Sequence, residues 1–118
     1  MYKVLMPLKR KAGMSVEDFR AYYETYHRLI GEKYLKGYAT KYQRRYITAL
    51  PDAEGQIAEP DFDVLLEIWF PDEATFQKCA GGFAAPEAEK EIREDEEKLF
   101  DRSHMPSLTV QEYESDMS

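Results

Sequence analysis

The chain has 118 residues, 43% of them hydrophobic, which suits one hydrophobic core but not two ordinary domains. Asp and Glu outnumber Lys and Arg by 23 to 16, and the resulting formal charge of −7 would repel the phosphate backbone of nucleic acid. We therefore expect a single domain over residues 1–118 that does not bind nucleic acid.

Cys79 is the only cysteine, so an intramolecular disulfide, a zinc ribbon and a CxxC redox pair are all excluded. A chain without disulfides indicates a reducing compartment. The apolar run Val4–Leu8 is too short for a membrane span or a signal-peptide core, and Lys9 ends it. We expect a cytoplasmic protein with no membrane partner.

Alternation of side chains over Tyr2–Lys9 predicts a first strand, and Gly13 marks the turn after it. Ser15 is a suitable N-cap for a helix, since acidic residues follow in the first turn. Apolar and aromatic residues then recur every three or four positions, which predicts a helix to about Gly31 with an extension over residues 32–37. This stripe consists of Phe19, Tyr22, Tyr23, Tyr26, Leu29 and Ile30.

Two further strands are predicted at residues 38–48 and 62–70, joined by an acidic surface connection over residues 51–60. A short helix is expected from Asp72 to about Ala80, broken by Gly81-Gly82. Pro86 suits the start of another helix, which has its apolar side at Ala88, Ile92, Leu99 and Phe100. Alternation over residues 106–113 predicts the last strand.

This order of elements predicts an α+β fold, a ferredoxin-like βαββαβ unit with a four-stranded antiparallel sheet. Helices would cover one face of the sheet. Leu65 and Trp69 lie on the other face of the third strand, which predicts a homodimer that packs sheet against sheet.

Three segments carry a resemblance to a known family. Residues 9–19, KRKAGMSVEDF, followed by Tyr22, Tyr23 and His27, resemble the N-terminal signature of the EthD-like family in the dimeric α/β barrel superfamily. Residues 62–70 and 91–101 resemble the later blocks of that family. The family usually continues after the histidine with a small residue, proline and leucine, whereas this chain has Arg28-Leu29-Ile30 and is expected to extend its helix there.

The resemblance implies a cofactor-independent enzyme that acts on an aromatic or polyketide-type intermediate. The implied reaction is a lyase-like proton transfer, such as dehydration, decarboxylation or cyclisation, in the catabolism of aromatic compounds. Two alternatives stay open: a non-catalytic ligand-binding or accessory protein of a degradation pathway, and a cofactor-free quinol monooxygenase. Membership of a family indicates the fold more reliably than the reaction, so the reaction has to be inferred from the residues of the site.

His27 is the first candidate catalytic residue. It lies about 40° around an ideal helix from Tyr23, at the border of the aromatic stripe. A half-desolvated imidazole there could act as a base near neutral pH. The alternative is a structural histidine whose ring packs on the sheet.

Tyrosines form the second signal, because nine occur in 118 residues. Phenol hydroxyls donate hydrogen bonds to carbonyl or enolate oxygen. For any single tyrosine, however, a structural ring that lies between the core and water is the better interpretation. We assign Tyr23 to catalysis with His27. We assign to substrate binding Tyr26, Tyr42, Tyr46, Trp69 and His104.

Asp95 or Glu96 should be partly buried, because both follow Ile92 on the apolar side of the last helix. We assign Asp95 to catalysis as an acid or as the partner of His27; the alternative is an ion pair with Arg93 or Lys98.

His104 follows Asp101 at the spacing by which His27 follows Glu24, and such pairs occur in dimetal sites. The further carboxylates of those sites and any haem-attachment motif are missing. We therefore expect neither metal nor cofactor.

Overall fold

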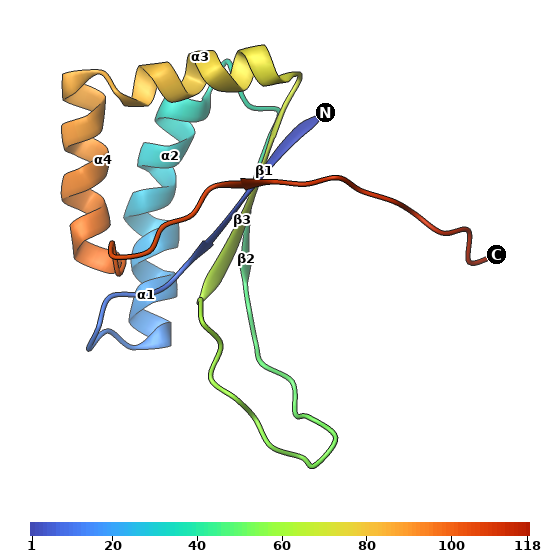
Figure 1. The fold of residues 1–118 in the computed structure, drawn as a ribbon. Coiled ribbons are helices and arrows are strands. Elements are labelled where there is room, and N and C mark those ends of the chain that lie inside the picture. The colour runs from blue at the N-terminus through green and yellow to red at the C-terminus, as the bar shows by residue number, and fades with distance from the viewer.

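The computed structural model describes all residues from Met1 to Ser118 and shows a four-stranded antiparallel sheet with helices on one face (Figure 1). The strands lie in the order β2-β3-β1-β4. Their bounds are β1 Tyr2–Leu8, β2 Lys41–Tyr46, β3 Val64–Phe70 and β4 Leu108–Thr109. The predicted ferredoxin-like α+β fold is confirmed.

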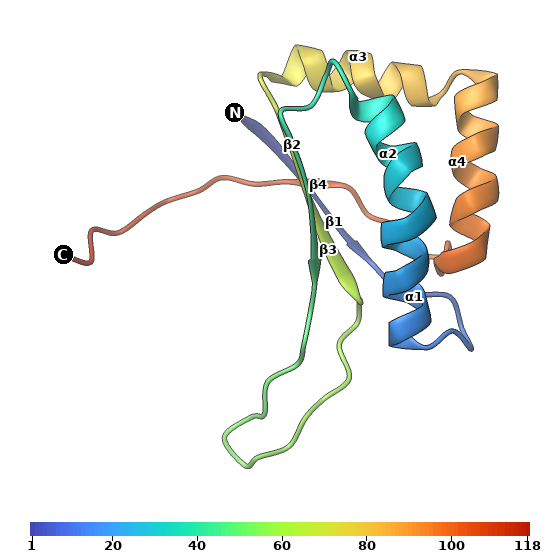
Figure 2. The ribbon, with the colours of Figure 1, turned by 180° about the vertical axis from the view of Figure 1, so that it is seen from behind.

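The helices form one layer beside the sheet (Figure 2). They are α1 Val16–Tyr22, the π-helix η1 Tyr23–His27, α2 Arg28–Leu35, α3 Glu73–Phe83 and α4 Pro86–Leu99. Ser15 caps α1 as predicted, because its hydroxyl accepts a hydrogen bond from the Asp18 N–H at 3.0 Å. None of these helices has the length and apolar character of a membrane span.

The hydrophobic core lies against the central strands β1 and β3. They pair antiparallel, with Tyr2 opposite Phe70 and Leu8 opposite Val64. Along β3 every second side chain is buried, as the alternation predicts. The buried set Val64, Leu66, Ile68 and Phe70 faces the helices and packs against Phe19 of α1, Leu35 of α2 and Leu99 of α4.

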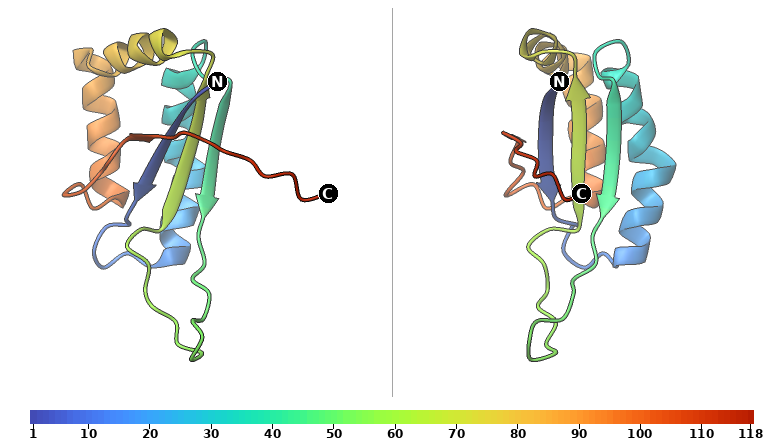
Figure 3. Two further views of the ribbon diagram at one scale, coloured as in Figure 1. Left: turned by 45° about the vertical axis from the view of Figure 1, so that its right-hand side comes forward. Right: turned by 90° about the vertical axis from the view of Figure 1, so that its right-hand side faces the viewer.

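The opposite face of the sheet carries no helix (Figure 3, right). Trp69 lies on this face near the end of β3, with the Lys3 and Lys41 ammonium groups 4.2 and 4.1 Å from its ring. Glu67 accepts hydrogen bonds from Arg45 and from the Trp69 indole. We call this surface the open face; it consists of Lys3, Leu5, Pro7, Lys41, Gln43, Arg45, Leu65, Glu67 and Trp69.

A π-helical segment interrupts the first helical run. The Arg28 N–H donates to the Tyr23 carbonyl, five residues back, so the turn from Tyr23 to His27 is wider than an α-turn. Both of these residues are buried. The helix then continues to Leu35, as expected from the missing proline after His27, and Gly37 turns the chain with φ of 88°.

Helix α3 differs from the prediction, because it passes through Gly81-Gly82 and ends at Phe83. Both glycines face open space. Phe83 packs edge-on against Tyr34 with ring centroids 6.3 Å apart. The helix continues to this contact despite the cost of about 1 kcal/mol for each glycine in a helix. On the same helix Cys79 is buried, and its thiol donates to the Tyr34 carbonyl at 3.7 Å.

Strand β4 is also shorter than predicted. Only Leu108 and Thr109 pair, opposite Leu5 and Val4 of β1. The alternation over residues 106–113 does not produce a longer strand, because the chain leaves the sheet after Thr109 and extends away from the helices (Figure 1). Tyr113 in this C-terminal segment is 93% exposed.

Candidate active site

A small cavity lies between the covered face of the sheet and the helices. Its volume is about 130 Å³, and twelve of its fifteen lining residues are hydrophobic. The lining comes from Met6, Leu8, Tyr23, His27, Ile30, Gly31, Tyr34, Leu35, Tyr42, Leu66, Ile68, Phe83, Ile92, Glu96 and Phe100. Its polar groups are therefore few: one imidazole, one carboxyl group and three phenols.

His27 enters the cavity from η1, with its ring edge-on to Tyr23 and Phe100 at 5.0 and 5.2 Å. Its Nδ1 lies 2.8 Å from Asp95 Oδ2. With Asp95 ionised, Nδ1–H donates this bond and the lone pair stays on Nε2. Asp95 therefore fixes the tautomer and the orientation of the imidazole, the second of the two roles predicted for it.

Burial lowers the pKa of His27 below its ordinary value, and the opposing attraction of Asp95 does not restore it. The neutral imidazole is therefore the prevailing form at neutral pH. A neutral ring with a free Nε2 lone pair in an apolar cavity is suited to accept a proton from a bound molecule.

Asp95 has a second donor, the Tyr22 hydroxyl, at 2.5 Å from Oδ1. Burial first, and then the Asp95 carboxylate, raise the pKa of Tyr22 to about 12. Tyr22 therefore stays a neutral donor. Asp95 does not line the cavity itself, so it acts on His27 from behind the ring.

Tyr23 and Tyr42 meet across the cavity, with their hydroxyl oxygens 2.5 Å apart. Burial raises the pKa of Tyr42 to about 12 and that of Tyr23 well above its ordinary value. The two neutral phenols have two hydroxyl hydrogens, and their mutual hydrogen bond uses one of them. The other hydrogen can be donated to a ligand oxygen.

Gly31 makes the position of Tyr42 possible. A β-carbon at Gly31 would lie 2.8 Å from the Tyr42 hydroxyl and 2.9 Å from a ring carbon. Tyr42 thus rests directly on the backbone of α2. From the sequence alone, Gly31 marks only the approximate end of the helical stripe.

Tyr46 does not line the cavity. Its hydroxyl donates to Glu24, which also binds the Arg44 guanidinium at 2.7 and 2.9 Å. Its ring packs edge-on against Tyr23 at 6.2 Å. Tyr46 therefore supports a cavity wall, and Glu24 faces Arg44 and Tyr46.

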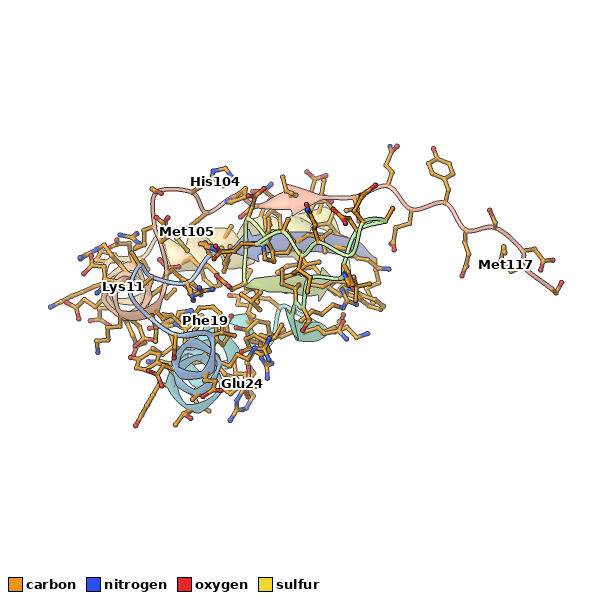
Figure 4. All side chains as sticks on the ribbon, turned by 90° about the horizontal axis from the view of Figure 1, so that it is seen from below. Lys11, Phe19, Glu24, His104, Met105 and Met117 are labelled. Carbon is orange, nitrogen blue, oxygen red and sulfur yellow. The ribbon has the colours of Figure 1, made fainter.

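Three other predicted binding residues lie outside the cavity. Tyr26 is 58% exposed on the outer side of η1, and Trp69 lies on the open face. His104 lines a separate open hollow with Asp101 and Lys9, well apart from Glu24 of η1 (Figure 4). No group of three His, Cys, Asp or Glu side chains is placed to hold a metal ion.

Two of the polar cavity residues were not assigned from the sequence. Tyr34 belongs to the expected helical extension, yet it follows His27 by seven positions and so shares its helix face. Glu96 was considered beside Asp95, and its spacing of four from Ile92 does indicate the cavity side.

Comparisons with known proteins identify the family of the chain. The sequence profile of the EthD domain matches residues 11–103. The chain belongs to the EthD family. No curated protein matches the sequence significantly.

Solved structures share the fold of this EthD protein at low identity. An EthD family protein from Bacillus halodurans has a TM-score of 0.62 at 18% identity, covering 96% of this chain and 100% of that one. An antibiotic biosynthesis monooxygenase has 0.54 at 12%, covering 97% and 100%. A hydroxynitrile lyase from Passiflora edulis has 0.52 at 12%, covering 97% and 96%. These likenesses show the fold alone.

Proposed function

We propose that this EthD protein is a cofactor-independent, lyase-like enzyme acting on an aromatic or polyketide-type ketone. His27 removes a proton from the carbon beside the carbonyl group. The observation that carries this proposal is the Asp95–His27 pair, whose Nε2 lone pair is free in an apolar cavity. The same arrangement of base and orienting carboxylate serves proton transfer in many enzymes.

Removing that proton puts negative charge on the carbonyl oxygen. The Tyr23–Tyr42 pair supports stabilisation of this oxyanion, because one of its hydroxyl hydrogens is free to be donated. Both phenols stay protonated, since burial raises their pKa values. The Tyr23–Tyr42 pair is therefore the proposed oxyanion donor, through its one free hydroxyl hydrogen.

The cavity limits what can bind. Its volume of about 130 Å³ is close to that of an engineered apolar cavity of about 150 Å³ that binds benzene. The cavity is therefore proposed to hold one group about the size of a benzene ring, the carbonyl-bearing part of the substrate, while the rest of a larger substrate lies at its mouth.

A second copy of the chain is the proposed partner on the open face. This face carries the half-buried Trp69 and Leu65 between charges of both signs. The C-terminal segment projects from the same face, where Glu112 pairs with Lys3 at 2.7 Å (Figure 3). A homodimer packed sheet against sheet would bury these apolar groups and oppose Lys and Arg to Glu67. Sedimentation velocity of the purified protein measures the oligomeric state.

Hydrogen exchange tests the proposed base. Phenylacetone carries one ring and acidic hydrogens beside its carbonyl, and their replacement by deuterium in D₂O is followed by NMR. The wild-type protein should catalyse this exchange, and His27→Gln should slow it by about 10²- to 10⁴-fold, the usual contribution of a positioned base. Asp95→Asn should also slow exchange, because the amide no longer fixes the imidazole tautomer.

The control is the thermal unfolding midpoint of each variant, which shows that the fold is intact. Exchange by His27→Gln at the wild-type rate would contradict the proposal. Tight phenylacetone binding with no exchange in any form would instead favour the ligand-binding role, and oxygen uptake during turnover would favour a monooxygenase.

A further inference from the structure

Two consecutive carboxyl groups on α4 have different surroundings. Asp95 is 6% exposed and receives hydrogen bonds from Tyr22 and His27, behind the imidazole. Glu96 turns into the cavity, where it is the only carboxyl group among the lining residues. Consecutive residues of a helix lie about 100° apart, which explains how one helix supplies both positions.

Glu96 has only one cationic neighbour. Arg102, in the segment after α4, places Nε 3.4 Å from Glu96 Oε1, and its guanidinium also approaches Glu97. This separation exceeds the usual N–H···O range of about 2.7–3.2 Å. The Glu96 side chain is 17% exposed, so neither water nor a close ion pair fully compensates its charge.

These surroundings favour the neutral acid. Burial raises the pKa of Glu96 above its ordinary value, Arg102 opposes the increase, and the charges of Asp95 and Glu89 add to it. The other titratable groups that face the cavity are the imidazole of His27 and the phenols of Tyr23, Tyr34 and Tyr42. A carboxyl group whose pKa is raised and a neutral imidazole in one cavity are the acid and base that an elimination reaction needs.

We propose that Glu96 is the proton donor of this cavity and that the substrate class is a β-hydroxy ketone carrying one aromatic ring. This inference rests on the proposed function. His27 Nε2 takes the hydrogen beside the carbonyl, the carbon–oxygen bond breaks, and Glu96 protonates the departing hydroxyl, which leaves as water. The products are a conjugated enone, an imidazolium and a carboxylate.

The same geometry accounts for the end of the reaction. The imidazolium formed at His27 is paired with Asp95 at 2.8 Å, and the carboxylate formed at Glu96 faces Arg102. Each new charge therefore has a partner of opposite sign. Proton loss from His27 to water and proton uptake by Glu96 restore the starting state, so no oxidant, reductant or further reactant is needed.

The experiment separates the base from the acid with two probes. Deuterium exchange of phenylacetone requires only the base. Dehydration of 4-hydroxy-4-phenylbutan-2-one to benzylideneacetone, followed by ultraviolet absorbance, requires the base and the acid. Glu96→Gln keeps the shape of the side chain but has no acidic proton, so it should retain exchange and slow dehydration by about 10²- to 10⁴-fold.

A matched control is Glu97→Gln, the next residue of α4, whose exposed side chain also approaches Arg102 but does not line the cavity. It should dehydrate the probe at the wild-type rate. The fall of dehydration rate on the alkaline side of its pH profile should also disappear in Glu96→Gln and persist in Glu97→Gln, since only Glu96 must be protonated.

The outcomes distinguish the two proposals. Wild-type exchange and dehydration that survive in Glu96→Gln would overturn the proton-donor role and leave His27 as the base. Absence of both reactions from the wild-type protein would overturn the proposed function. Carboxyl-carbon NMR of Glu96 gives an independent test, because titration at or below the ordinary range of glutamate would overturn the donor role whatever the probes show.

Discussion

The two faces of the sheet use the same strands for different purposes. On the covered face, alternate residues of β1 and β3 pack against helices and leave one small apolar cavity with a few polar groups. On the open face, the residues between them form a charged surface around Trp69 with no helix over it. The period-two pattern thus gives one sheet an apolar face that packs against helices and a charged face without them; the first is the proposed place of chemistry and the second the proposed place of assembly.

Neighbouring leucines of β3 give the largest expected difference between the faces. Leu66 is buried, so Leu66→Ala should lower the free energy of unfolding by about 2–5 kcal/mol at every protein concentration. Leu65 points to the open face, where Leu65→Lys should place charges in the proposed dimer interface. Its effect on unfolding should therefore depend on protein concentration.

Urea unfolding at two protein concentrations and sedimentation velocity measure both variants. A wild-type dimer that persists in Leu65→Lys would mean that the open face is not the interface. A wild-type monomer at every concentration would remove the assembly role altogether.

A pair of helical glycines gives an intermediate effect. Alanine in place of glycine usually stabilises a helix by about 1 kcal/mol, and Gly81→Ala should do so because its side chain would meet open space. Gly31→Ala should destabilise by about 1–3 kcal/mol, since the new β-carbon would overlap the Tyr42 hydroxyl. Thermal unfolding compares the two, and stabilisation by Gly31→Ala would show that Tyr42 moves freely.

Much of the covered face was predictable from the sequence, and the open face and the site boundary were less so. The burial alternation of β3 and the cap at Ser15 are local properties, and the sequence predicts both. The length of β4 and the continuation of α3 through Gly81-Gly82 depend on contacts with distant segments. Local pattern carries no information about those contacts.

The candidate site shows the same division. The helical stripe identifies Tyr23, with His27 at its border, but it also includes Tyr26, which is exposed. Helix periodicity places both Asp95 and Glu96 near the cavity. Only the fold shows that Asp95 lies behind His27 and that Glu96 lines the cavity. His104 lies in a separate hollow because residues after α4 follow the edge of the sheet.

The pH dependence of stability gives the smallest expected effect. Because burial lowers the pKa of His27, the unfolded chain binds this proton more readily than the folded one. The corresponding stability is fully present above the ordinary value of 6.5 and is lost as pH falls below it. The urea midpoint should therefore fall between about pH 7 and pH 5 less steeply in His27→Gln than in the wild type. Equal slopes would contradict a buried neutral histidine.

The single thiol of the chain makes the helix layer observable without an added label. Cys79 is buried on α3, its thiol donates a hydrogen bond to the Tyr34 carbonyl, and burial raises its pKa. A thiol reagent therefore reaches it only when α3 moves away from α2. The rate of its alkylation therefore reports how often this side of the ligand chamber opens. A ligand that fills the chamber would slow that chemistry in proportion to its occupancy.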